Sequence, residues 1–209
     1  MSKKNTEQIQ GSDVSATNRV MFIVLGVILV TFVIVMVLMF NKGQLPQTVP
    51  SGVKKVLVEM KIKDRGTMKL ELRNDLMPKT VNNFVRNIMS GYYDGRKFFR
   101  ADNYMTSAGS PTDEAGVDNR EPVDLETNKE LNVERYSIGM GKDTPTNKSS
   151  QSIFFIAKAK EADFNQKYAV FGKITDIPSQ KILDRLQEND VIEKVTVISY
   201  DGNTSIPSP

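Results

Sequence analysis

The chain has 209 residues, enough for one domain of ordinary size with an appendage, and its hydrophobic and charged fractions are those of a folded protein. It contains no His and no Cys, which excludes serine–histidine and cysteine nucleophiles, thiolate or imidazole zinc sites, and disulfide bonds. The formal net charge of +3 is small and the basic residues are scattered, so we expect no nucleic-acid partner.

The amino-terminal part predicts a membrane anchor. Residues 1–19 form a short polar tail, and residues 20–40 (VMFIVLGVILVTFVIVMVLMF) are uncharged and almost wholly apolar. A helix of that length, rising about 1.5 Å per residue, crosses a hydrocarbon core of about 30 Å. A cleaved signal peptide is disfavoured because the apolar run is too long and no Ala-x-Ala-like site follows it. We therefore expect a single-pass protein of the cell membrane whose residues 20–40 contact the lipid bilayer.

The orientation of this span is predicted less directly. Three basic residues precede it and three follow it, so the positive-inside rule hardly discriminates: Lys3, Lys4, Arg19, Lys42, Lys54 and Lys55. A short polar tail ahead of a first span usually stays in the cytoplasm, and the lack of Cys suits an exported chain. We expect the following domain outside the cytoplasm. Residues 41–53 predict a linker, since NKGQLPQTVPSG at residues 41–52 is rich in Pro, Gly and polar residues. Residues 201–209 predict a flexible tail.

Residues 54–200 predict a mainly β domain. Residues 56–62 and 68–72 alternate apolar and polar side chains around a turn, which is typical of a hairpin. Pro78 begins an amphipathic helix that Gly91 ends, and a second helix is predicted near residues 179–187. Further short strands are predicted at residues 97–100, 104–107, 136–140, 152–157, 169–174 and 191–198. Many short strands with few helices predict a closed antiparallel barrel capped by helices.

No segment predicts a metal or cofactor site. The acid-rich run at residues 113–130 lacks the spacing of a calcium loop, so we interpret it as a solvated surface loop. GMGKDT, at residues 139–144, lacks the upstream Gly of a phosphate loop and has Asp143 where Ser or Thr binds magnesium, which favours a strand end and turn.

Five blocks of sequence carry a family resemblance. PKTVNNFVRNIMSGYYDGRKFFR, YMTSAGSPT, YSIGMG, SIFFI and KYAVFGKI follow one another across the domain. In this order and spacing they resemble the cyclophilin family of peptidyl-prolyl cis-trans isomerases, in a membrane-anchored, bacterial-like form. The resemblance implies a closed eight-stranded antiparallel barrel capped by two helices, with an open groove on one face. It also implies a monomer that acts on proline-containing polypeptide clients without a cofactor, assisting the folding of exported proteins.

The resemblance assigns the site residues. Arg100 falls on the family's catalytic arginine, and four residues match the walls of the proline pocket: Tyr104, Met105, Phe155 and Phe164. In the sequence, Arg100 lies among aromatic, methyl-bearing and small residues (FFRADNYMTSAGSPT), and we expect no neighbouring carboxylate to pair with it by default.

Several site positions depart from the family pattern. Phe99 replaces a frequent His, Tyr168 replaces a pocket His, and the loop between Arg100 and Tyr104 is one residue short. Ser107 and Ile153 stand at two glutamine positions, although Gln151 would share the face of Ile153 in an extended strand. Asp163 stands where many members have Trp, which predicts poor cyclosporin binding. A longer loop, KDTPTNKSSQ, is inserted before SIFFI.

Arg100 suits the chemistry that the resemblance implies. Rotation about a peptide bond has a barrier of about 18–20 kcal/mol because nitrogen shares its lone pair with the carbonyl. In the twisted state the nitrogen regains that lone pair and can accept a hydrogen bond, which a permanently protonated guanidinium can donate. Neither a nucleophile nor an acid–base pair is needed.

Two other functions remain open from the sequence. The missing polar partners at Ser107 and Ile153 motivate a binding or chaperone module with little isomerase activity. A structural membrane protein, with a span that pairs with partner helices, is the third hypothesis; Gly26 is the only small-residue notch in that span, so no small-xxx-small face supports it.

Overall fold

The computed structural model describes residues 21–22, 24–32, 48–115, 118, 120–143 and 146–203. The chain divides into two compact units, Met1–Pro46 and Gln47–Pro209. In the first unit, residues 21–22 and 24–32 are helical. No helix in the described part of the chain is both long and apolar enough to span a bilayer. The rest of the predicted span, the tail at residues 1–19 and most of the linker lie outside the described residues.

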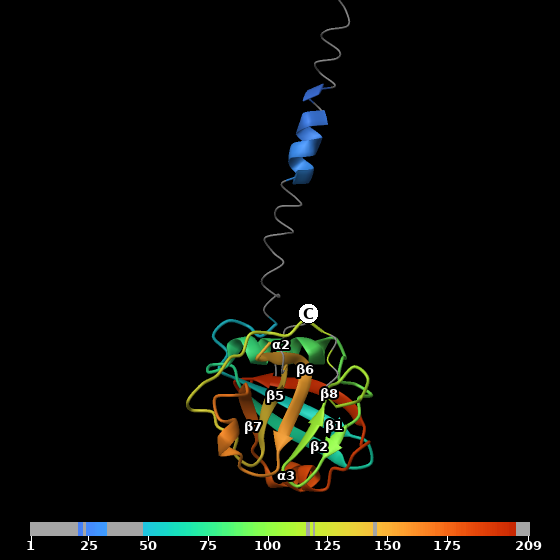
Figure 1. Cartoon of the computed structure of the whole chain (residues 1–209), viewed down its shortest axis with the longest axis vertical. Helices are drawn as coiled ribbons and strands as arrows, with labels where there is room; N and C mark the ends of the chain where they lie inside the picture. The colour runs from blue at the N-terminus through green and yellow to red at the C-terminus, as the bar shows by residue number, and fades with distance from the viewer. Residues whose placement is uncertain are drawn as a thin grey trace, which may run out of the picture. The chain divides into compact units, whose positions relative to one another are not determined.

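The second unit is built on one antiparallel sheet (Figure 1). Its spatial order is β3-β4-β6-β5-β7-β2-β1-β8, and every neighbouring pair is antiparallel. The strands are β1 (Lys55–Ile62), β2 (Gly66–Arg73), β3 (Arg100–Ala101), β4 (Met105–Ala108), β5 (Ser137–Asp143), β6 (Lys148–Ala157), β7 (Val170–Ile174) and β8 (Ile192–Tyr200). The predicted hairpin is confirmed, since Val58 pairs with Leu70 and Met60 with Met68, all with their side chains in the core.

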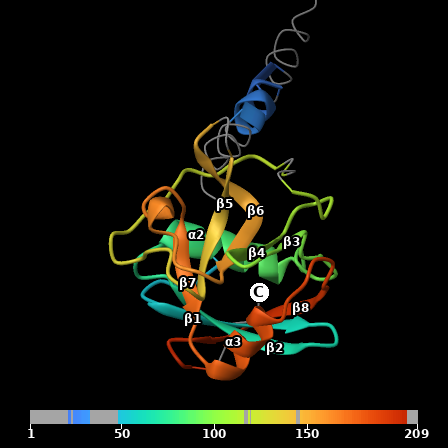
Figure 2. The same ribbon diagram turned by 60° about the horizontal axis from the view of Figure 1, so that its bottom comes forward.

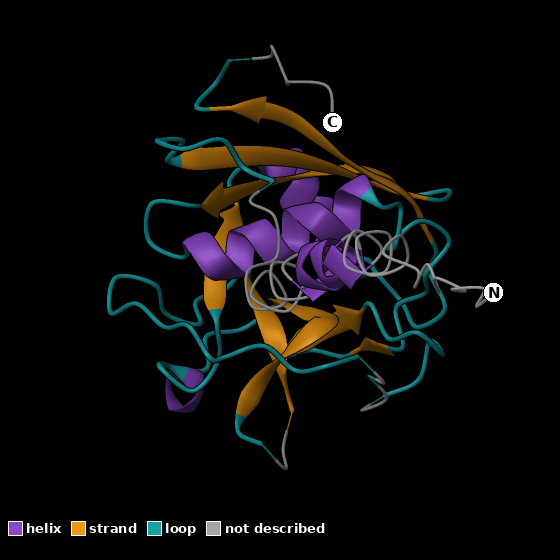
Figure 3. Ribbon diagram, turned by 90° about the horizontal axis from the view of Figure 1, so that it is seen from above, coloured by secondary structure: helices purple, strands orange, loops and turns teal. Residues whose placement is uncertain are grey.

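The predicted closed barrel is wrong: the sheet curls, as Figure 3 shows from above, but does not close. Its two edges are β3 and β8, which form no ladder with each other. Instead, the segment before β3 meets the start of β8 and the residues before it, where Phe98 N–H donates to Asp190 O at 3.0 Å and Ile192 N–H donates to Arg96 O at 2.8 Å. β3 has only two residues before the chain turns, whereas we predicted residues 97–100, and so short a strand cannot form a second ladder.

The KDTPTNKSSQ insertion, predicted as a loop, is largely a continuation of two strands (Figure 2). β5 runs on to Asp143 and β6 begins at Lys148, and these two residues pair with each other. The insertion therefore lengthens the β5–β6 hairpin, in which Lys142 pairs with Ser149 and the backbone continues the existing ladder.

Two helices pack against opposite ends of the curled sheet (Figure 1). α2 (Pro78–Met89) has Pro in its first turn and is followed by Gly91 at φ +67°, as the sequence predicts. α3 (Ile177–Asp184) begins and ends earlier than predicted because Asp176 accepts a hydrogen bond from Ser179 N–H at 2.9 Å and so caps the helix. Below α2 the core is aromatic, with the Phe84 ring centroid 5.0–5.6 Å from those of three other rings: Tyr93, Phe154 and Phe171.

Segments that we assigned to the linker and the tail contact this core. Asn82 Oδ1, on α2, accepts hydrogen bonds from Thr48 N–H and Val49 N–H, both at 2.9 Å, and the Val49 side chain is buried. At the other end of the chain, an Asp201 carboxylate oxygen accepts from Lys55 N–H at 2.7 Å. Thr48, Val49 and Asp201 are thus fixed to the domain by specific hydrogen bonds.

Candidate active site

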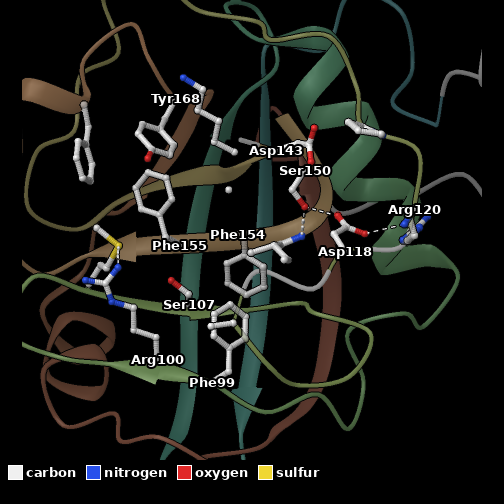
Figure 4. Close-up of a pocket in the computed structure, with 17 residues that line it drawn as sticks. Phe99, Arg100, Ser107, Asp118, Arg120, Asp143, Ser150, Phe154, Phe155 and Tyr168 are labelled. Carbon is white, nitrogen blue, oxygen red and sulfur yellow. Dashed lines mark hydrogen bonds between the residues drawn. The ribbon is translucent and has the colours of Figure 1, made fainter. Parts of the chain in front are cut away.

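One cavity of about 290 Å³ opens on the face formed by β3, β4, β5 and β6 (Figure 4). Its lining includes all the residues that the family resemblance assigned except Tyr104 and Gln151: Phe99, Arg100, Met105, Ser107, Ile153, Phe155, Phe164 and Tyr168. These residues come from β3 and the residue before it, from β4 and β6, and from the 3₁₀ turn η2 (Ala162–Phe164) and the loop after it. Segments separated by more than fifty positions therefore meet at one site.

The end of the cavity near Arg100 is apolar and rests on a small core of its own. Phe155 and Met105 are almost fully buried and cluster with Val133, Ala157 and Val170, separately from the main core. Phe155 and Tyr168 meet edge to face with ring centroids 5.6 Å apart, and Phe164 and Tyr168 lie 4.9 Å apart. Rigid aromatic walls of this kind can hold a small apolar ring.

The two glycines of the GMG sequence on β5 make room for this end of the cavity. Gly139 pairs with Phe155 across the strands, and a Cβ on Gly139 would lie 2.5 Å from Phe155 Cζ. A Cβ on Gly141 would lie 2.9 Å from Ile153 Cγ2. The glycines therefore allow two cavity-lining side chains to lie flat against the β5 backbone, which gives the GMG segment a purely steric function.

Arg100 lies at the edge of the apolar end, and its side chain is 44% exposed. Its Nε–H donates to Asp102 Oδ2 at 2.6 Å, and Nη1 donates to Met105 Sδ at 3.2 Å. In Figure 4 the guanidinium and the Phe155 ring flank the same cavity, with Ser107 beside them. The expectation that no neighbouring carboxylate pairs with Arg100 is wrong, because the turn after β3 folds Asp102 back onto it.

Asp102 is held from two sides. Its Oδ1 accepts hydrogen bonds from Tyr104 N–H at 2.7 Å and Met105 N–H at 2.9 Å, while Oδ2 accepts from Arg100. Burial raises the pKa of Asp102, but the hydrogen bonds from Met105, Arg100 and Tyr104 outweigh burial and leave this pKa below its ordinary value. The carboxylate is therefore ionised at neutral pH. The signal that could have revealed it is an Asp at the start of a short turn, which commonly caps the N–H groups that follow.

The opposite end of the cavity is charged (Figure 4). Asp118 Oδ2 accepts hydrogen bonds from the Ser150 hydroxyl and from Gln151 N–H at 3.1 Å. Arg120 Nη1 donates to Asn87 Oδ1 at 2.9 Å, and its guanidinium carbon lies 4.6 Å from the Tyr92 ring centroid. No sequence pattern predicts these contacts.

The interpretation of the acid-rich run as a solvated surface loop is therefore incomplete, because two of its carboxylates bind the domain. Asp118 binds the backbone of β6, and Glu126 Oε2 accepts from both Thr80 N–H and Thr80 Oγ1 at 2.7 Å at the start of α2. These carboxylates attach the loop to the domain. Among the described residues no group of three or more acidic side chains is arranged to hold a metal ion.

Two assigned residues lie elsewhere. Tyr104 is 59% exposed, and its carbonyl accepts from Lys158 N–H at 2.7 Å, which fixes this residue at the tip of the Asp102 turn. The Gln151 carbonyl accepts from the amides of Asn83 and Asn87 at 2.7 and 2.9 Å, so this part of β6 is tied to α2. Asp163 lies in η2 next to Phe164, and only Phe164 of the two lines the cavity.

Comparison with known proteins agrees with this arrangement. The family model described as cyclophilin type peptidyl-prolyl cis-trans isomerase/CLD matches residues 57–201. A peptidyl-prolyl cis-trans isomerase of Helicobacter pylori is 31% identical over 138 residues, covering 63% of this chain and 82% of that protein. Human peptidyl-prolyl cis-trans isomerase-like 3 is 34% identical over 137 residues, with the same two coverages of 63% and 82%.

Solved structures show the same fold. A cyclophilin type peptidyl-prolyl cis-trans isomerase of Cryptosporidium parvum matches with a TM-score of 0.62 at 23% identity, covering 69% of this chain and 98% of that chain. The structure of that protein determined in the presence of the dipeptide Ala-Pro matches with a TM-score of 0.61. The chain therefore belongs to the cyclophilin-type peptidyl-prolyl cis-trans isomerase family, and its activity is the cis–trans isomerisation of Xaa-Pro bonds.

Proposed function

We propose that Arg100 is the catalytic residue and that it accelerates rotation by hydrogen bonding to the twisted amide of a bound Xaa-Pro bond. The observation that carries this proposal is the cavity itself, where one guanidinium lies beside an apolar end lined by Met105, Phe155 and Phe164. A prolyl ring seated at that end would have its amide nitrogen near the guanidinium.

The hydrogen bonds of Arg100 leave donors for the substrate. A guanidinium has five N–H groups. Asp102 accepts from Nε, and the other acceptor is the thioether of Met105, which is weak and easily displaced. The remaining Nη hydrogens can therefore meet a nitrogen lone pair that exists only in the twisted state, which stabilises that state over both planar isomers.

The proposed substrates are proline-containing polypeptides. The solved relative with Ala-Pro supports this choice, since that protein was crystallised in the presence of a proline dipeptide. In Figure 4 Asp118 and Arg120 lie at the end of the cavity away from Arg100, where they would meet the part of a client chain beyond the proline.

We also propose that residues 20–40 anchor the enzyme in the cell membrane, with the isomerase domain outside the cytoplasm and exported proteins as clients. Support comes from the apolar sequence and from the described helical residues of this segment, whose apolar side chains are all exposed, at 50–68%. The Thr31 hydroxyl donates to Ile28 O at 2.9 Å, so this polar group needs no water. Protease accessibility in intact cells tests the side: cleavage of the domain without lysis supports the proposal, and protection contradicts it.

The catalytic proposal is tested with the full chain in detergent, by comparing wild type with R100A. Removing one preorganised donor costs about 100-fold to 1000-fold in rate where the donor acts on developing charge or lone-pair density. We expect R100A to lose most of its acceleration of cis–trans exchange in an Ala-Pro peptide while it still binds the peptide. Equal rates for R100A and wild type would refute a catalytic Arg100, and peptide binding without acceleration by wild type would favour the binding-module hypothesis.

A further inference from the structure

The hydrogen bonds around Arg100 single out its carboxylate partner. The two carboxylate oxygens of Asp102 have different partners. Oδ1 accepts from the N–H groups of Tyr104 and Met105, and Oδ2 accepts from Arg100 Nε–H at 2.6 Å. In addition, Asp102 N–H donates to Met105 O at 3.1 Å. Two hydrogen bonds thus fix the carboxylate to the β3–β4 turn, and a third fixes the backbone of Asp102, before the carboxylate meets the guanidinium.

We propose that Asp102 is a positioning residue for catalysis, which holds the Arg100 guanidinium at the cavity by its Nε edge and leaves its Nη edge for the substrate amide. The inference rests on the proposed catalytic function of Arg100. It assigns to a turn carboxylate the task of orienting a donor that is otherwise long, flexible and 44% exposed.

The position of Asp102 follows from the local backbone. β3 ends at Ala101, and the chain turns at once, so the side chain two residues after Arg100 lies on the same side of the hairpin. The residue paired across the strands with Arg100 is Ser107, whose side chain is too short to replace the longer glutamine of the family pattern. A shorter loop therefore supplies, from within the turn, the acceptor that the neighbouring strand lacks.

Holding Nε has a specific consequence. An arginine side chain has several rotatable bonds, and an ion pair on a surface contributes little unless its geometry is fixed. Here the acceptor is itself fixed by backbone N–H groups, so the hydrogen bond restricts the guanidinium plane as well as its place. Placement errors of about 1 Å can cost about 100-fold in rate.

The test uses D102N, because its amide oxygen can still accept from Tyr104 and Met105 while its amide nitrogen would face Arg100 Nε–H, donor against donor. We expect D102N to lose about tenfold or more in kcat/KM, with the loss mainly in kcat. The matched control is D75N, because Arg73 and Asp75 form the same kind of pair two residues apart at 2.8 Å, outside the cavity. D75N should keep wild-type activity.

A structural effect on the turn is separated by two further variants. D102S can also cap the turn but cannot reach Arg100, so it should match D102N in activity. D102N/S107Q places a long acceptor opposite Arg100 and should regain at least part of the lost rate, which a merely damaged turn would not. Urea unfolding of each variant checks that it is folded.

The possible results separate the two proposals. If R100A is inactive but D102N keeps wild-type kcat/KM, the positioning role is refuted and the catalytic role of Arg100 stands. If R100A keeps wild-type activity, the proposed function fails first. A folded D102N that loses activity, with no recovery in D102N/S107Q, would assign the loss to the turn and overturn the inference.

Discussion

Replacing Gly139 by Ala should damage the site without touching a polar group. The new Cβ would lie 2.5 Å from Phe155 Cζ and 2.7 Å from Phe155 Cε1. Ordinary carbon contacts begin near 3.5 Å, so the ring has to move by about 1 Å. Tyr168 and the surrounding small core limit its retreat, which leaves movement into the cavity.

The size of the effect follows from two quantities. Overpacking a buried site costs about 1–3 kcal/mol of unfolding free energy. A ring displaced by about 1 Å at the proline seat should lower kcat/KM by about tenfold to 100-fold. Urea unfolding and a peptide isomerisation assay measure these two effects on the same protein.

A double-mutant cycle with F155A isolates the clash. F155A removes the ring that Gly139→Ala would strike, so adding G139A to F155A should cost much less stability than adding it to wild type, by about 1 kcal/mol or more. If G139A is fully active and as stable as wild type, or if its cost is unchanged in F155A, the steric function assigned to the GMG segment is wrong.

Three further predictions concern ionisable groups and the contacts of residues 48–49 with α2. Because the chain has no His or Cys, kcat/KM should be flat between about pH 5.5 and 7.5, and a sigmoidal or bell-shaped profile there would reveal a titrating group that the account lacks. The pKa values of Asp75 and Asp102 are lowered in the folded protein. The two ionised carboxylates therefore stabilise the fold fully above the ordinary carboxyl pKa of 3.8, and this contribution is lost as the pH falls through their pKa values in the folded protein. D75N/D102N should show a shallower loss of stability than wild type in acid unfolding. N82A removes the acceptor of two backbone N–H groups and should lower the free energy of unfolding in urea by about 1–3 kcal/mol, while the folded fraction keeps its activity. An unchanged urea midpoint would show that the hydrogen bonds from residues 48–49 to Asn82 do not stabilise the domain.

The regular parts of the fold could be predicted because they depend on local patterns. Alternation marks β1 and β2, and the spacing of apolar residues between Pro78 and Gly91 marks α2. The closed barrel could not be excluded in this way, since closure depends on the length of β3, a strand of two residues whose end is set by a turn.

The same limit applies to the site. The family resemblance predicted residues that line one cavity, but it predicts nothing at the positions where this chain departs from the family pattern. The pairing of Asp102 with Arg100, the exposure of Tyr104 and the contacts of Asp118 all depend on how two irregular segments fold back onto strands. Side-chain hydrogen bonds of that kind leave no periodic signal in the sequence.

The most direct test of the account measures the exchange rate of an Ala-Pro peptide by NMR at equal concentrations of wild type, R100A and R100K. We expect a loss of about 100-fold in R100A and a substantial loss in R100K, since lysine keeps the charge but lacks the planar fork that contacts Asp102 and the cavity together. Exchange rates within about twofold of wild type for both folded variants would contradict it.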